Sequence, residues 1–125
     1  EMNRFTNLLA VAAISFSVAA CATTMYDAPT KMSNGVMVNS AGMTVYTFDK
    51  DTPHSGKSAC NGPCIALWPA VTPTGEVKGD YSVITRDDGS KQLAYKGKPL
   101  YLYVKDQKPG DVTGDNVKDV WHVVK

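Results

Sequence analysis

Two cysteines, Cys60 and Cys64, stand four positions apart and offer thiol chemistry. Thiols this close form a disulfide when their Cα atoms lie within about 7 Å of each other. Two thiolates can also bind copper together with a histidine, and a cysteine at the start of a helix has a lowered pKa that suits redox exchange. The side chains that could complete a copper site are the two histidines and three of the methionines, His54, His122, Met32, Met37 and Met43. We expect a structural disulfide, with copper binding and thiol redox chemistry as the alternatives.

Two aspartates, Asp51 and Asp106, each follow a tyrosine by five residues, namely Tyr46 and Tyr101. Paired carboxylates can act as general acid and general base. A repeated position is usually architectural, however, and an aspartate at a strand end can accept hydrogen bonds from the backbone N–H groups of the following turn. We therefore interpret both aspartates as structural. The sequence has no Ser-His-Asp constellation, phosphate-binding glycine loop or zinc-type spacing, so we expect no enzyme, no metal site and no cofactor.

Both aspartates follow an aromatic-x-aromatic pattern, and a tryptophan that opens a short apolar run comes after each. The tyrosines are 55 residues apart and the tryptophans 53. Two landmarks with nearly one offset indicate a duplicated unit. Aromatic side chains at alternate strand positions share a face, so they could form a ligand-stacking platform or pack against one another as core. We expect the core, built from the repeated residues Tyr46, Phe48, Trp68, Tyr101, Tyr103 and Trp121.

The elements that must position these residues are short and rich in β-branched and aromatic side chains. Glycine-containing turns separate two pairs of such runs, which predicts hairpins. Pro63 and Pro69 bracket one helical turn, since proline fits the first helical position and cannot continue a helix. The expected fold is a small, all-β, antiparallel domain of two related hairpin units with a helical turn near 63–68. Its predicted strands are 36–39, 44–48, 81–85, 91–95, 99–104 and 120–124.

The first twenty residues have the pattern of an export signal rather than of a folded element. Asn3-Arg4 precedes an uncharged apolar stretch that is too short to span a bilayer. Small residues then lead to Cys21, as at a lipoprotein cleavage site, with an ordinary signal peptide as the alternative. We expect a signal peptide at 1–20, lipidation of Cys21, a tether at 21–34, and one domain at 35–125 with repeats at about 35–71 and 81–124. The net charge is +1 with or without the signal, which favours no nucleic-acid partner.

Several motifs together resemble a known family. They are Tyr-x4-Asp at Tyr46 and again at Tyr101, Cys-Asn-Gly-Pro-Cys at 60–64, Trp68-Pro69, and Gly110–Gly114 ahead of the apolar run at 120–124. The sequence resembles bacterial lipoproteins described as secreted repeats of unknown function, with a Tyr-x-aromatic-x-x-Asp motif. The resemblance covers roughly residues 35–125 and implies a surface or periplasmic lipoprotein with two repeats and no established enzymatic activity. The second repeat lacks the cysteine pair, so the role of that pair is not common to both.

These observations predict a cell-envelope lipoprotein that acts as a non-enzymatic binding or structural module. Its expected partners are the membrane, through the N-terminal lipid, and a protein of the envelope or of a host. Ala22 is not the aspartate associated with inner-membrane retention in enteric bacteria, so the outer membrane is favoured if the host is Gram-negative. The alternative function is a periplasmic copper-binding or thiol-redox protein that uses Cys60 and Cys64. A third possible function, inhibition of lysozyme or of a host protein, is compatible with the size and location but has no supporting motif.

Overall fold

The computed structural model describes residues 28–125. The expected signal peptide, the lipidated Cys21 and the first part of the tether lie outside the described residues. Within 28–125 no helix is both long and apolar enough to cross a membrane.

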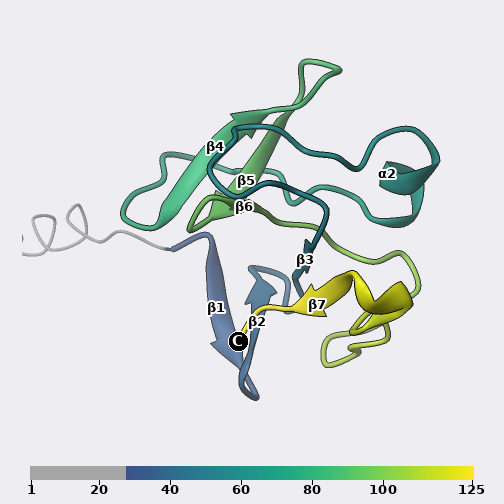
Figure 1. The fold of residues 1–125 in the computed structure, drawn as a ribbon. Coiled ribbons are helices and arrows are strands. Elements are labelled where there is room, and N and C mark those ends of the chain that lie inside the picture. Colours follow the sequence, from purple (N-terminus) through teal and green to yellow (C-terminus); the bar gives the residue numbers. More distant parts are fainter. Residues whose placement is uncertain (1–27) are drawn as a thin grey trace, which may run out of the picture.

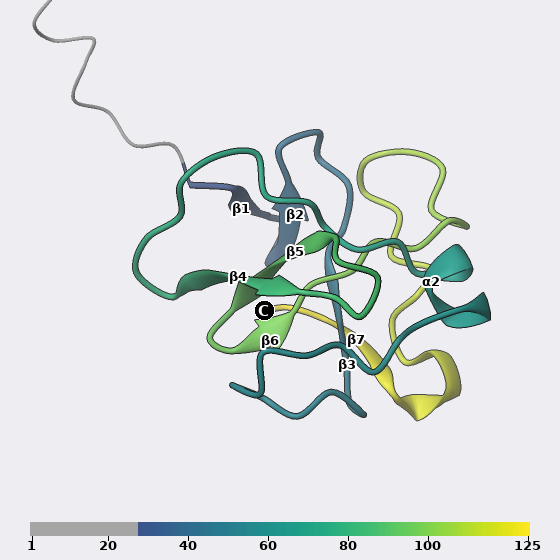
Figure 2. The same ribbon diagram turned by 90° about the horizontal axis from the view of Figure 1, so that it is seen from above.

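Short strands in three small antiparallel sheets form most of the regular structure, which confirms the all-β prediction (Figure 1). The sheets have the strand orders β1–β2, β3–β7 and β4–β5–β6. In Figure 1 the β4–β5–β6 sheet lies above the other two, and in Figures 1 and 2 helix α2 and the η2 turn beside β7 lie at the same end of the molecule. The bounds are β1 Thr30–Ser33, β2 Val36–Asn39, β3 Tyr46–Phe48, α2 Pro63–Leu67, β4 Tyr81–Thr85, β5 Lys91–Tyr95, β6 Lys98–Pro99, η2 Val117–Asp119 and β7 Trp121–Val123.

Regular structure is already present within the range that the sequence predicts as a tether. Strand β1 lies within the range expected as tether, and it pairs with β2 through a turn at Asn34 and Gly35, both at positive φ. This backbone matches the right-handed twist of two-residue hairpins. The side chain of Thr30 is buried, and its hydroxyl forms a 2.6 Å hydrogen bond with the Tyr81 hydroxyl. This contact with the second repeat stabilises β1, whose own sequence offers few apolar side chains to bury.

The two predicted hairpins have different outcomes. Strands β4 and β5 pair over five positions, as predicted for 81–85 and 91–95. The runs 36–39 and 44–48 are joined only at a bridge between Val38 and Thr44, because the chain then leaves β2 and pairs as β3 with β7. The strand predicted at 99–104 is likewise short, since β6 ends at Pro99 and Tyr101 forms isolated bridges. The predicted helical turn is present as α2, with Pro63 at its start.

Each repeat pairs its aromatic strand with the tryptophan strand of the other repeat. Phe48 of β3 is opposite Trp121 of β7. In the equivalent arrangement, the Leu102 N–H donates to the Pro69 carbonyl at 2.7 Å, and Tyr101 bridges to Ala70. The two repeats therefore interdigitate, and each aromatic strand has its strand-pairing partner in the other repeat.

The two tyrosines meet where the repeats cross. The backbone N–H of Tyr46 donates to the Tyr101 carbonyl at 2.8 Å, and the Tyr101 N–H donates to the Tyr46 carbonyl at 2.9 Å. Both side chains are fully buried, in one cluster with Cys60 and the two tryptophans. The second cluster is aliphatic and consists of Met37, Val45, Val71, Leu93 and Leu100. The aromatic residues of both repeats thus share one core.

Candidate functional site

Four aromatic rings, two from each repeat, form a continuous pile that we call the aromatic stack: Phe48, Trp121, Trp68 and Tyr103, in that order. The ring centroids of Phe48 and Trp121 are 4.2 Å apart, and those of the two tryptophans are 3.8 Å apart with an interplanar angle of 2°. The Trp68 and Tyr103 centroids are 3.9 Å apart. The two repeats are therefore related by an approximate twofold axis that passes between the two indoles.

Strand pairing and helix ends hold the aromatic stack in place. Phe48 and Trp121 are cross-strand neighbours in the β3–β7 pair, where side chains on one face lie close together. Trp68 follows the last residue of α2, and its backbone N–H donates to the Cys64 carbonyl. The buried tyrosines add edge-on contacts, Tyr46 against Trp68 at 5.5 Å and Tyr101 against Trp121 at 5.1 Å. These edge-to-face arrangements are favourable because a ring edge is positive and a ring face negative.

A groove of about 630 Å³ lies along the aromatic stack, and we call it the stack groove. Its walls are α2 on one side and the η2 turn on the other, the two elements that Figures 1 and 2 place at one end of the molecule. The repeats contribute equivalent positions, since Lys50 and Lys105 each follow a stack aromatic by two residues. The lining residues are Phe48, Lys50, Pro63, Cys64, Leu67, Trp68, Tyr103, Lys105, Val117, Lys118, Val120 and Trp121.

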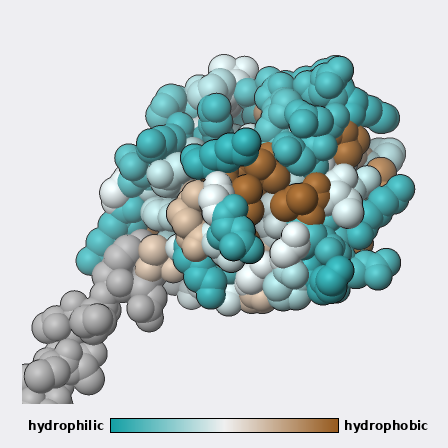
Figure 3. Space-filling view, turned by 90° about the horizontal axis from the view of Figure 1, so that it is seen from below, coloured by the Kyte–Doolittle hydropathy of each residue, from teal (hydrophilic) through white to brown (hydrophobic). Residues whose placement is uncertain are grey.

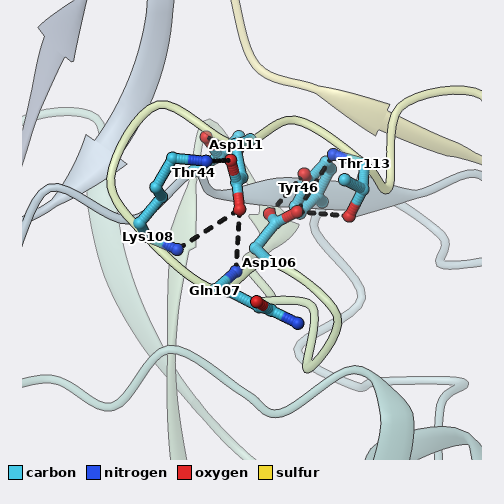
Figure 4. A network of polar contacts seen from close by, with 7 residues as sticks. All are labelled: Thr44, Tyr46, Asp106, Gln107, Lys108, Asp111 and Thr113. Atoms are coloured by element: carbon cyan, nitrogen blue, oxygen red, sulfur yellow. Dashed lines mark hydrogen bonds and ion pairs between the residues drawn. The ribbon is translucent and has the colours of Figure 1, made fainter.

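The tyrosine and the aspartate of the repeated Tyr-x4-Asp motif bond across the repeats rather than within one motif. The Tyr46 hydroxyl donates to Asp106 Oδ2 at 2.6 Å, so the tyrosine of the first repeat binds the aspartate of the second (Figure 4). The other oxygen of Asp106 accepts the Thr113 backbone N–H at 2.9 Å and the Thr113 hydroxyl. The Gly114 N–H donates to the Tyr46 hydroxyl oxygen at 3.1 Å. Asp106 is therefore held by groups from both repeats.

The reciprocal pair has the same form. The Tyr101 hydroxyl donates to Asp51 Oδ2 at 2.6 Å, and the Ala59 N–H donates to Asp51 Oδ1 at 2.6 Å. The Ser58 hydroxyl lies 2.6 Å from the Tyr101 hydroxyl. Each aspartate thus binds the backbone of the loop that follows it, as its position in the sequence suggests. Its second partner, the tyrosine of the other repeat, is not indicated by the sequence.

Burial raises the pKa of three groups in these pairs, Tyr46, Tyr101 and Asp51. Desolvation, followed by the hydrogen bond to a carboxylate, raises the pKa of the Tyr46 and Tyr101 hydroxyls well above the ordinary value. Desolvation also raises the pKa of Asp51, against the opposing effect of its hydrogen bonds from Tyr101 and Ala59. Among the described residues no hydrogen bond joins Asp51 to Asp106. The carboxylates lie in two separate hydrogen-bonded sites, one for each tyrosine.

A buried arginine is an important residue that sequence reasoning missed. Arg86 is 5% exposed, and its guanidinium donates to the Ser58 hydroxyl at 2.9 Å, to Gln92 Oε1 at 2.8 Å and to the Cys60 carbonyl. It also donates to Asn61 Oδ1 at 3.0 Å. The planar guanidinium suits several simultaneous acceptors. Its position before the Asp-Asp-Gly turn gave no sign that it would anchor the loop around the cysteines.

Cys60 and Cys64 form a disulfide, with their Cα atoms 5.2 Å apart. Cys60 is buried in the aromatic cluster, and Cys64 lines the stack groove. The bridge therefore ties the start of α2, which is one wall of that groove, to the core.

The candidate copper ligands are not gathered around the cysteines. His122 is half-buried and bonds Asp49 at 2.8 Å and Asn116 at 3.1 Å, whereas His54 packs against Gly97. Met32 is exposed on β1. Within residues 28–125 no group of three or more histidine, cysteine, aspartate or glutamate side chains is arranged to hold a metal ion. The alternative of copper binding thus has no assembled site in this part of the chain.

Comparison with known protein families gives one match, to a lipoprotein family described as a secreted repeat of unknown function. It matches twice, over residues 30–72 and 82–125. The first match begins at the first residue of β1, so β1 belongs to the first repeat of the family. Neither the comparison with curated proteins nor that with solved structures gives a match.

Proposed function

Because the chain belongs to this family of secreted-repeat lipoproteins, we propose that it is a lipid-anchored protein of the cell envelope that binds a ligand in the stack groove without catalysing a reaction. In this proposal Cys21 carries the lipid, and residues between it and β1 act as the tether. If the host is Gram-negative, Ala22 favours the outer membrane.

The observation that carries the proposal is the contrast between two sets of residues that both repeats supply. The tyrosine–aspartate pairs are buried and hydrogen-bonded to each other, which suits holding the repeats together. The stack groove is open, is built by both repeats and lies between helix α2 and the η2 turn. Ligand sites are commonly concave, mostly apolar and supplied with a few polar groups. The groove has this character, and its aromatic floor extends the shared core to the surface.

The face shown in Figure 3 has no broad continuous apolar surface. On the face seen in Figure 3, apolar residues form small patches among hydrophilic ones. A stable protein interface usually buries about 800 Å² on each partner, with an apolar centre. We therefore place the binding role in the stack groove rather than on a broad apolar face.

The binding role can be tested in intact cells by site-specific photo-crosslinking. A benzophenone amino acid at Leu67, which lines the groove and is 47% exposed, should give an adduct with the natural ligand or partner. The same replacement at Val83 on β4 is the matched control, because Val83 is 42% exposed but does not line the groove. Adducts at neither position, or equal adducts at both, would contradict a binding role for the groove.

The anchor is tested separately by replacing Cys21. Wild-type protein should sediment with membranes, and Cys21→Ser should be found in the soluble envelope fraction with unchanged folding. Membrane association that survives Cys21→Ser would refute lipid anchoring at this residue without bearing on the groove.

A further inference from the structure

We propose that the stack groove binds a small planar aromatic molecule that carries a negative charge, such as an aromatic carboxylate, sulfonate or phosphate. This inference rests on the proposed function and specifies its ligand. It is carried by the ring arrangement, by the charges around the groove, and by two indole N–H groups.

The floor of the groove presents ring edges. Trp121 lies between Phe48 and Trp68, and Trp68 lies between Trp121 and Tyr103, so both faces of each indole are covered by neighbouring rings. One edge of each indole also packs against a buried tyrosine, Tyr46 or Tyr101, so only the remaining edge of each indole is left for a ligand. Ring edges carry partial positive charge and prefer the electron-rich face of another aromatic ring. A planar aromatic ligand can therefore lie across the stack with edge-to-face contacts along its length.

The charged side chains at the groove are all positive. Lys50, Lys105 and Lys118 line it, and no lining residue among the described part of the chain is acidic. None of the three lysines forms an ion pair or side-chain hydrogen bond with another described residue. None of the aspartates adjacent to these lysines in sequence lines the groove. Three of them are bonded elsewhere, Asp49 to His122, Asp51 to Tyr101 and Asp106 to Tyr46, and the fourth is Asp119. Unpaired lysines on both sides of an apolar floor favour an anionic ligand.

The two indole nitrogens give a further, independent reason. Trp68 is 4% exposed and Trp121 is 3% exposed, yet neither indole N–H donates a hydrogen bond to a described residue. A buried tryptophan N–H usually has a hydrogen-bond partner. Both rings line the groove, so an acceptor bound within reach of an indole nitrogen would supply the missing partner.

The size of the groove favours a small molecule over a folded partner. Sites for small ligands occupy roughly 300–1,000 Å³, and the stack groove has about 630 Å³. An acidic protein segment would satisfy the lysines but would need a broader surface beyond the groove. A protein adduct at Leu67 in the crosslinking experiment would therefore contradict this inference and leave the proposed binding function in place.

The test uses the mature chain with Cys21→Ser, which retains every described residue. Three probes separate the contributions: 2-naphthalenesulfonate has both ring and charge, 2-naphthalenemethanol has the ring alone, and octanesulfonate has the charge on an aliphatic chain. Binding is followed by NMR through backbone amide signals and the two indole N–H signals. From the size of the first probe we expect a Kd on the order of 1 mM or tighter, with shifts confined to the groove residues. The other two probes should bind several-fold more weakly.

Charge variants complete the test. Lys50→Met and Lys105→Met should each raise the Kd of 2-naphthalenesulfonate about two- to fivefold, and the double variant about tenfold, because each exposed ion pair contributes little by itself. Lys31→Met on β1 is the matched control and should leave the Kd unchanged. The Kd of the uncharged alcohol should not respond to any of these variants, and the sulfonate should bind more weakly as salt is added.

Three results would overturn the inference: no binding of any aromatic probe at millimolar concentration, equal binding of the charged and uncharged probes, or shifts located away from the groove. A specific Leu67 adduct combined with any of these would mean that the groove has a ligand of another class. If no aromatic probe binds and no specific Leu67 adduct forms, the result counts against the proposed function itself.

Discussion

The exchange of tyrosine–aspartate pairs between the repeats can be measured by double-mutant cycles. Tyr46→Phe removes one of the three donors to Asp106 and leaves the Gly114 N–H without its acceptor. A hydrogen bond to a charged group contributes about 1.5–3 kcal/mol, and a buried unpaired donor costs at least about 1 kcal/mol. We expect Tyr46→Phe to lower the free energy of unfolding by about 3 kcal/mol. Tyr101→Phe should have a similar cost, because the Tyr101 hydroxyl bonds both a carboxylate and a serine.

The cycles identify which aspartate each tyrosine contacts. Tyr46→Phe combined with Asp106→Ala should show a coupling of about 1–3 kcal/mol, since the two side chains share a hydrogen bond. Tyr46→Phe combined with Asp51→Ala, the aspartate of its own motif, should be additive within about 0.5 kcal/mol. Urea unfolding, followed by tryptophan fluorescence and by circular dichroism, gives each value if the two signals coincide.

The result that would refute this reasoning is coupling within a motif. If Tyr46 coupled to Asp51 and not to Asp106, each repeat would close on itself. The exchanged arrangement would then be wrong, and so would the shared groove that depends on it. Equal m-values across the variants would exclude a change in the unfolded state as the source of the coupling.

Further predictions concern packing, pH and chain connectivity. Gly114→Ala should lower the free energy of unfolding by about 1–3 kcal/mol, because the added Cβ would lie 2.8 Å from Cη2 of Trp68. Gly75→Ala is the control and should change it little, since the space around Gly75 is open. Chemical unfolding measures both, and equal losses would contradict this packing. The pKa of the two buried tyrosine hydroxyls is raised, so their contribution to the free energy of unfolding is complete below about pH 10 and is lost as the pH rises above that value. The loss should reach up to about 2.7 kcal/mol per pH unit, because the unfolded chain releases one proton from each tyrosine. Absorbance at 295 nm should show these two tyrosines ionising only as the protein unfolds, and ionisation in the folded state would disprove their burial. Fragments 28–76 and 77–125 should each be unfolded by circular dichroism and regain structure when mixed, because each aromatic strand pairs with the other repeat; a folded single fragment would argue against interdigitation.

Much of the fold follows from local pattern. The Asp-Gly turn between two β-branched runs predicts the β4–β5 hairpin, and Pro63 predicts the start of α2, because both signals act through the backbone of a few neighbouring residues. Strand β1 escaped prediction for the opposite reason. Its residues have weak local preference, and its stability comes from pairing with β2 and from the distant hydrogen bond of Thr30 to Tyr81.

The site shows the same division. The sequence identified the stack aromatics as packed core, but not the lysines beside them, because a lysine two positions after an aromatic residue is an ordinary surface pattern. Arg86 was missed since nothing near it in the sequence marks a buried cation. The groove lysines and Arg86 each act together with residues of the other repeat, and those residues come close only when the chain folds.

By itself the sequence determined that a unit occurs twice, that the aromatic residues of both copies pack together and that the two nearby cysteines of the first copy can be bridged, because spacing and side-chain type are enough for each. Only the tertiary structure decided that Tyr46 binds Asp106 and Tyr101 binds Asp51. Two copies of one motif offer the same donor and the same acceptor, so their types cannot distinguish partners within a repeat from partners between repeats. The path of the chain makes that choice, by pairing β3 with β7 across the molecule.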